Sequence, residues 1–249
     1  MSKEVVKKVE AAPALAQAMA MDQWDTPVLS ANDIVIEKIL PLQKMSKKLE
    51  DRKAGYRYSE LRSTMESRLF GDLDQGFEFI PVAMERFWVI TEGKDKKFVG
   101  IVPENSENQN LPYEEMVDGK LITRVRFMEF YVLIPSDVKD GGAVPYLLSF
   151  KSTSLKAGKS LATQMYVKNR AANLPPPATV CELTLEEKSN DKGTFLVQSV
   201  KAKRKASAEE IQAAFNWYTS IKSGAVKKDD SDLVDTTIED IIDVDTKEF

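Results

Sequence analysis

Arginines and aromatic side chains alternate in two apolar-rich segments of the chain, and this pattern is suited to binding nucleic acid. Along an extended strand every second side chain points to the same face. Single-stranded nucleic acid is bound by cations that contact phosphates and by flat rings on which bases stack. The residues concerned are Arg86, Trp88, Arg124, Arg126 and Phe130. In the competing interpretation, the rings belong to the core and the arginines cover a solvated surface.

Further basic residues cluster later in the chain. One group follows a predicted strand into a predicted helix, and a second closes the last predicted strand. A single cluster of this kind is usually a solvated surface, and only convergence of clusters in space would create a phosphate-binding channel. The residues that we assign to such a channel are Lys151, Lys156, Lys159, Lys168, Arg170, Lys201 and Lys203.

The C-terminal segment has the opposite charge. Residues 229–249 contain nine acidic side chains and one lysine, a net charge of −8, whereas residues 1–228 carry +4. This composition predicts a disordered acidic tail on a basic body. Apolar residues such as Ile238 and Ile242 interrupt the acids, and Phe249 is the last residue. A segment that only kept the protein in solution would need none of these apolar side chains.

Two absences exclude several kinds of enzyme. The sequence has one cysteine, Cys181, and no histidine. An intrachain disulfide, a cysteine-based zinc site and catalysis by a Ser-His-Asp or Cys-His arrangement are therefore excluded. No stretch approaches the roughly 18 consecutive apolar residues that predict a membrane span. We expect no enzymatic activity, no catalytic residue, no bound metal, no cofactor and no membrane contact.

Two motifs imitate catalytic sites. Residues 153–160 end in Gly-Lys-Ser like a phosphate-binding loop, but Thr153 stands where that motif needs its first glycine. Asp74, Glu92 and Lys94 follow the spacing of the carboxylates and lysine that hold magnesium and orient water in some nucleases. The second motif needs no histidine, so a magnesium-dependent nuclease stays open as an alternative function.

A β-rich domain would have to position these side chains. Segments rich in β-branched and aromatic residues predict strands at residues 77–91, 97–102, 121–135, 144–152, 178–187 and 194–204. Helices are predicted at residues 154–171 and 207–222, with a short one around 58–69 and a polar loop at 103–120. The fold class is therefore mainly β (α+β), an OB-like Greek-key barrel with an inserted helix, a C-terminal helix and a disordered acidic tail. We expect a loosely ordered segment at 1–32, the barrel domain at 33–224 and the tail at 225–249.

The predicted C-terminal helix has a clear start and a predicted buried side. Ser207 and Glu210 have the spacing of a capping box, in which each side chain bonds the backbone of the other. Helical periodicity then predicts which residues face the core. These are Ile211, Ala214, Phe215, Tyr218 and Ile221.

The order of several segments resembles a family of bacteriophage single-stranded DNA-binding proteins. The matching segments are residues 33–49 (DIVIEKILPLQKMSKKL), 77–82 (FEFIPV), 145–161 (PYLLSFKSTSLKAGKSL) and 190–195 (NDKGTF), the helix near 207–222 and the acidic tail. The resemblance implies an OB-like core that coats single-stranded DNA without sequence preference in phage replication or recombination, in the host cytoplasm. It also implies that the tail binds replication or recombination proteins. Its contact residues would be Asp240, Asp243, Asp245, Glu248 and Phe249.

Other functions share the basic surface and stay open. A single-strand annealing recombination protein would differ by accelerating the pairing of complementary strands, and a phage structural protein would have no affinity for DNA. A homodimer is compatible with the sequence. The charge of the tail further predicts that it competes with DNA for the basic surface.

Overall fold

The computed structural model describes residues 36–42, 57–64, 68–139, 142–190, 193–224 and 226. The strands form one sheet in the order β10-β9-β4-β7-β8-β1-β2-β3, with β5 paired to β4 and β6 paired to β7. Only the pairing of β1 with β8 is parallel among these described strands. The strands are β1 (Lys38–Pro41), β2 (Leu61–Ser63), β3 (Leu69–Gly71), β4 (Phe77–Glu92), β5 (Lys97–Pro103), β6 (Glu114–Val117), β7 (Lys120–Leu133), β8 (Pro145–Lys151), β9 (Thr179–Asn190) and β10 (Gly193–Lys205).

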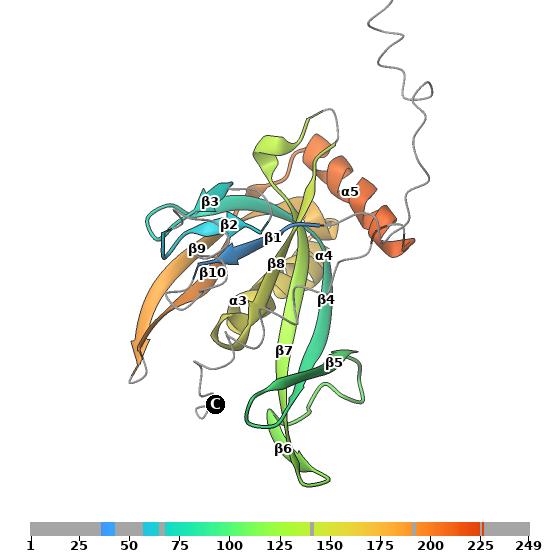
Figure 1. Ribbon diagram of the computed structural model, residues 1–249. Coiled ribbons are helices and arrows are strands. Elements are labelled where there is room, and N and C mark those ends of the chain that lie inside the picture. The colour runs from blue at the N-terminus through green and yellow to red at the C-terminus, as the bar shows by residue number, and fades with distance from the viewer. Residues whose placement is uncertain are drawn as a thin grey trace, which may run out of the picture.

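The long strand β4 organises the sheet because its two halves have different neighbours. Residues 77–79 pair with β9, and residues 80–92 pair with β7. β9 pairs with β4 only up to residue 79, and farther along the same edge of β4 residues 87–92 pair with β5. The sheet curls strongly into a half-barrel, and the far ends of β4 and β7 project from it together with β5 and β6 (Figure 1). We call this projection, residues 85–126, the arm.

Helices cover both faces of the sheet. α3 (Leu155–Thr163) contacts β7, β8 and β10 inside the curl of the sheet (Figure 1). It continues through the π-helical segment η4 (Gln164–Lys168) into α4 (Asn169–Ala171). α5 (Ala208–Lys222) packs on the opposite face, where it contacts β4. We call the face beneath α3 the inner face and the face beneath α5 the outer face. The short 3-10 turns are η2 (Pro135–Asp137), η3 (Ser152–Ser154) and η5 (Pro176–Ala178).

Both faces of the central strands are buried. On β7 the inner-face residues Met128 and Phe130 pack beneath α3, and the outer-face residues Phe127 and Tyr131 pack on the other side. The face of β7 with Phe127 and Tyr131 is therefore a core face. The inner face is buried as well, because a helix distant in the sequence covers it.

A glycine brings α3 close to the sheet. A Cβ atom at Gly158 would lie 3.0 Å from the Cβ of Phe150 and 3.3 Å from the Sδ of Met128, which is tighter than ordinary contact. Ala157 and Leu161 are buried on the same side of the helix. The other side of α3 is left to solvent, and the core holds the helix in a defined position.

The mainly β, OB-like fold with an inserted helix and a C-terminal helix is confirmed. Two local predictions are wrong. The expected helix around 58–69 is replaced by β2 and β3, because β2 pairs with the edge of β1. The polar loop at 103–120 contains β6, whose four residues are all on the surface and which pairs with β7. In both places, pairing with a partner strand overrides weak local preferences. Among the described residues, no helix is long and apolar enough to cross a bilayer.

Candidate nucleic-acid interface

The arginines of the arm lie on the inner face, and acidic side chains neutralise them. The carboxylate of Glu104 accepts hydrogen bonds from Arg126 Nε at 2.5 Å and Nη2 at 2.6 Å, and Arg86 Nη1 lies 3.1 Å from it. The backbone N–H of Glu104 donates to the carbonyl oxygen of Arg86, which fixes the carboxylate between the two guanidinium groups. Arg124 pairs with Glu115 at 2.8 Å. These three cations are therefore already paired within the protein.

The two rings predicted to stack on bases are core residues, which corrects the sequence-based assignment. Trp88 is 6% exposed, and the guanidinium of Arg126 lies 5.8 Å from its ring. Phe130 is fully buried and packs edge-on against Phe150 with the ring centroids 5.5 Å apart. A base cannot reach a ring that protein atoms already cover on both faces, so neither residue can serve as a stacking platform in this conformation.

Three of the predicted lysines lie on the outer face, away from α3. Lys151 is opposite Phe127 in the sheet, and its Nζ lies 5.7 Å from the centre of that ring. Lys203 donates to Glu182 at 2.8 Å, and this hydrogen bond raises the pKa of the lysine. Lys201 is exposed on β10 directly opposite Glu182. The structure therefore does not bring all the predicted cations to one surface.

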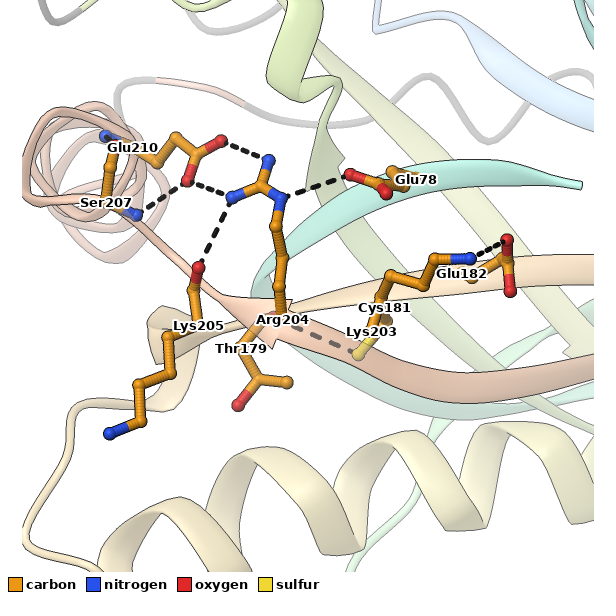
Figure 2. Close-up of polar contacts among 9 residues, drawn as sticks. All are labelled: Glu78, Thr179, Cys181, Glu182, Lys203, Arg204, Lys205, Ser207 and Glu210. Atoms are coloured by element: carbon orange, nitrogen blue, oxygen red, sulfur yellow. Dashed lines mark hydrogen bonds and ion pairs between the residues drawn. The ribbon is translucent and has the colours of Figure 1, made fainter.

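An ion-pair network fixes the end of β10 to the start of α5 (Figure 2). Arg204 donates two hydrogen bonds to Glu210 at 2.8 and 2.9 Å and lies 3.3 Å from Glu78. The guanidinium of Arg204 holds the pKa of Glu210 below its usual value. Glu210 also accepts from the backbone N–H of Ser207, and the hydroxyl of Ser207 caps the helix in return, so the predicted capping box is confirmed. This network is structural, because its charges are satisfied internally.

The four remaining predicted cations are different. Lys156, Lys159, Lys168 and Arg170 are exposed on α3, η4 and α4, and none forms an ion pair within the part of the chain that the structure describes. At 1.5 Å per residue they extend over roughly 21 Å of helix. We call these four residues the helical stripe. It consists of exposed positive charges on a helical segment that the core holds in place.

A sequence signal for the helical stripe exists, but basic clusters alone did not reveal it. Residues 141–181 contain no aspartate or glutamate. Charged surfaces usually carry both signs, since neighbouring opposite charges lower the local potential. The helical part of this run carries four basic side chains and no acid, and it is there that cations have no ion-pair partner among the described residues.

Neither imitation of a catalytic site is assembled. Gly158 lies inside α3, packed on Phe150, so no open loop precedes the helix to hold a phosphate. Asp74 lies before β4 and Glu92 ends it, so the whole strand, roughly 50 Å along the chain, lies between them. Glu92 pairs with Lys120 instead. Burial raises the pKa of Cys181 to about 12, which leaves an unreactive thiol, and the described residues contain no cluster of side chains that could hold a metal ion.

The residues of α5 that are exposed differ in part from the predicted ones. Ala213, Ala214 and Trp217 pack toward the sheet, and the indole N–H of Trp217 donates to the carbonyl oxygen of Ala143 at 2.6 Å. Phe215 and Tyr218, which were predicted to face the core, are 58% and 38% exposed. The helix is rotated toward the small residues because two alanines allow it to lie close to the sheet.

The predicted partner-binding residues Asp240, Asp243, Asp245, Glu248 and Phe249 lie outside the described residues.

No curated protein and no solved structure matches the chain. A protein-family model described as Pam3 phage gp34-like protein matches residues 6–227. This match covers most of the chain, the whole sheet and all the described helices. The chain therefore belongs to the Pam3 phage gp34-like family and is a bacteriophage protein.

Proposed function

We propose that this phage protein binds single-stranded DNA without sequence preference and coats it during replication or recombination in the host cytoplasm. The observation that carries the proposal is the helical stripe, four exposed cations without acidic partners among the described residues. Phosphate contacts from lysine and arginine supply most of the affinity of sequence-independent binding. We propose a binding protein rather than an enzyme.

The surroundings of the helical stripe support this role. α3 packs on the inner face through Gly158, so the cations are presented by a helix that cannot move freely against the sheet. Cations on a fixed helix keep a constant spacing and lose less entropy when they bind a strand than cations on a flexible loop. Lysine contacts to phosphate carry no base information, which fits a protein that covers any sequence.

The acidic tail is proposed to regulate the same surface. Its net charge of −8 makes it a competitor of DNA for the helical stripe. When a strand binds, the tail is displaced, and its acids together with Phe249 become available to replication or recombination proteins. This arrangement would couple partner recruitment to the presence of a bound strand.

The proposal is tested by fluorescence anisotropy with a labelled oligo-dT, over a range of salt concentrations. The wild-type protein should bind at low salt, and its affinity should fall steeply as salt rises. Replacing Lys156 and Lys159 with glutamine should lower the slope of log K against log salt by about 0.7 for each lost phosphate contact. Lys203→Gln is the matched control, because Lys203 is paired with Glu182 on the outer face.

Two results would contradict the proposal. If the wild-type protein has no affinity for oligo-dT even at low salt, it does not coat single strands. If Lys203→Gln lowers the slope as much as the α3 variants do, the helical stripe is not the phosphate-binding surface. For the tail, removal of residues 229–249 should tighten DNA binding at low salt, and equal affinity of both chains across the titration would exclude competition.

A further inference from the structure

Three aromatic rings lie exposed near the end of the helical stripe. Tyr166, Phe215 and Tyr218 are 38%, 58% and 38% exposed. No other aromatic side chain of the described residues is exposed to this extent. Exposed rings that gather in one place usually mark a binding surface, whereas single exposed apolar residues need no explanation.

The rings come from two helical segments that meet beside η5. η5 contacts both η4, which carries Tyr166, and α5, which carries the other two rings. η5 also contacts α4, which directly follows η4. Burial raises the pKa of Tyr166, and the electrostatic influence of the Tyr218 phenol raises it further.

Their exposure follows from how each segment is anchored. On α5, Phe215 and Tyr218 are three residues apart and share the side that faces away from the sheet. In η4, Met165 is buried and the next residue, Tyr166, points outward. π-helical turns are rare and occur often at functional sites.

Asn169 holds the π-helical segment rigidly. This side chain is 3% exposed, donates to the carbonyl oxygen of Pro176 at 2.9 Å, and accepts from Thr179 Oγ1 at 2.8 Å and Gln164 Nε2 at 2.9 Å. Because every one of these bonds is internal, the segment is fixed to η5 and to the start of β9. Tyr166 is therefore presented by a rigid support.

The charge around the rings selects the kind of ligand. Lys222 lies 5.9 Å from the centre of the Tyr218 ring, and Lys168 and Arg170 follow Tyr166 within about one turn. Residues 211–226, like residues 141–181, contain no acidic side chain. A surface that combines exposed rings with cations and lacks acids is complementary to a chain of bases and phosphates.

We propose that Tyr166, Phe215 and Tyr218 form a stacking platform for the bases of a single strand whose phosphates follow the helical stripe. The inference rests on the proposed function and adds the location of base contact to it. It also supplies a reason for strand selectivity, because bases inside a duplex are stacked on one another and cannot lie on protein rings. The β-strands of the arm, in which Trp88 is buried, would make no contact with the bases.

The test separates ring stacking from phosphate binding by using two ligands of equal length. Full-length protein is titrated with labelled oligo-dT and with an abasic strand that has the same phosphates and no bases. Wild-type protein should bind oligo-dT more tightly than the abasic strand. Phe215→Ala and Tyr218→Ala should each weaken oligo-dT binding by roughly 5-fold to 100-fold and leave the abasic affinity unchanged.

Two variants serve as controls. Tyr218→Phe keeps the ring and should retain the wild-type affinity. Val99→Ala changes a side chain that is 56% exposed on β5 of the arm, and it should affect neither ligand. Ultraviolet crosslinking to a bromodeoxyuridine strand, followed by mass spectrometry, should place the crosslinks on Tyr166, Phe215 or Tyr218.

The outcomes distinguish this inference from the proposed function. If wild-type protein binds neither strand, the proposed function itself fails. If it binds both strands equally, or if the alanine variants keep full oligo-dT affinity, the protein binds DNA but the rings are not the platform. Equal losses on both strands would also overturn the inference, and crosslinks confined to the arm would do the same. Formation of a wild-type dimer that Phe215→Ala dissociates, with DNA affinity unchanged, would assign the rings to a second copy of the chain.

Discussion

The arm and the α3–α4 segment both carry several cations, yet the two surfaces differ in net charge and in how many of these cations are paired with acids. Residues 85–126 contain eight acidic and seven basic side chains, a net charge of −1. Residues 155–181 contain four basic side chains and no acid. On the arm the arginines are paired with Glu104 and Glu115, whereas the helical stripe has no such partners among the described residues.

The difference shows that counting cations does not locate a phosphate-binding surface. In a sheet, side chains of neighbouring strands lie within about 5 Å of one another, so an arginine readily meets an acid from the next strand or loop. A helix packed on one side directs its remaining side chains to solvent, where a cation stays unpaired unless its own sequence neighbours are acidic. Pairing therefore decides which cations of the two regions keep a charge that no acid compensates.

The largest expected effect comes from Phe130, which the alternation pattern placed on the DNA-binding face. Phe130→Ala should lower the free energy of unfolding by about 3–5 kcal/mol, because it removes a fully buried ring. Urea denaturation monitored by circular dichroism measures this change, with Val99→Ala as the control that should alter stability little. If Phe130→Ala denatures like the wild-type protein but loses affinity for DNA, Phe130 would belong to the DNA-binding face.

Glu104 tests whether pairing is what keeps the arm from binding phosphate. Glu104→Gln removes the charge between Arg86 and Arg126, so stability should fall by roughly 1–3 kcal/mol. At the same time oligo-dT affinity should rise at low salt, because two guanidinium groups lose their acidic partner. Anisotropy in a salt series measures the affinity. An unchanged affinity would mean that the arm lies away from the bound strand.

The pair of Arg204 and Glu210 predicts a modest dependence of stability on pH. The pKa of Glu210 is lowered in the folded state, so its stabilisation is complete above the usual value of 4.5 and is lost as the pH falls through the folded pKa. Because Arg204 is 42% exposed, solvent screening limits the effect to about 1 kcal/mol. Urea midpoints between pH 3 and 7 should fall less steeply in acid for Glu210→Gln than for the wild-type protein. Parallel curves would assign the acid sensitivity to other groups.

The smallest effect is expected at Trp88. Its ring is buried beneath Arg126, and its indole nitrogen has no hydrogen-bond partner among the described residues. Trp88→Phe should therefore leave oligo-dT affinity within roughly twofold of the wild-type value. The comparison with Tyr218→Ala in the same assay contrasts a buried ring of the arm with an exposed ring beside the helical stripe. A larger loss at Trp88 than at Tyr218 would reverse the assignment of the two regions.

Much of the fold could be predicted from the sequence. The strands β4, β5, β7, β8, β9 and β10 have strong β-branched and aromatic patterns, and α3 and α5 have clear periodicity or caps. β2, β3 and β6 are three or four residues long, so no local pattern could distinguish them from loops. The alternation on β7 separates its two faces, but it cannot show that a helix covers the side with Phe130.

For the candidate site, the sequence alone determined which segments are rich in cations and which lack acids, because composition does not depend on folding. Only the tertiary structure decided which cations remain unpaired and which rings remain exposed. Glu104 reaches Arg126 because β4 and β5 form a hairpin, and Phe215 is exposed because alanines bring the other side of α5 onto the sheet. Burial and ion pairing depend on neighbours that are distant in the chain, and no local pattern contains them.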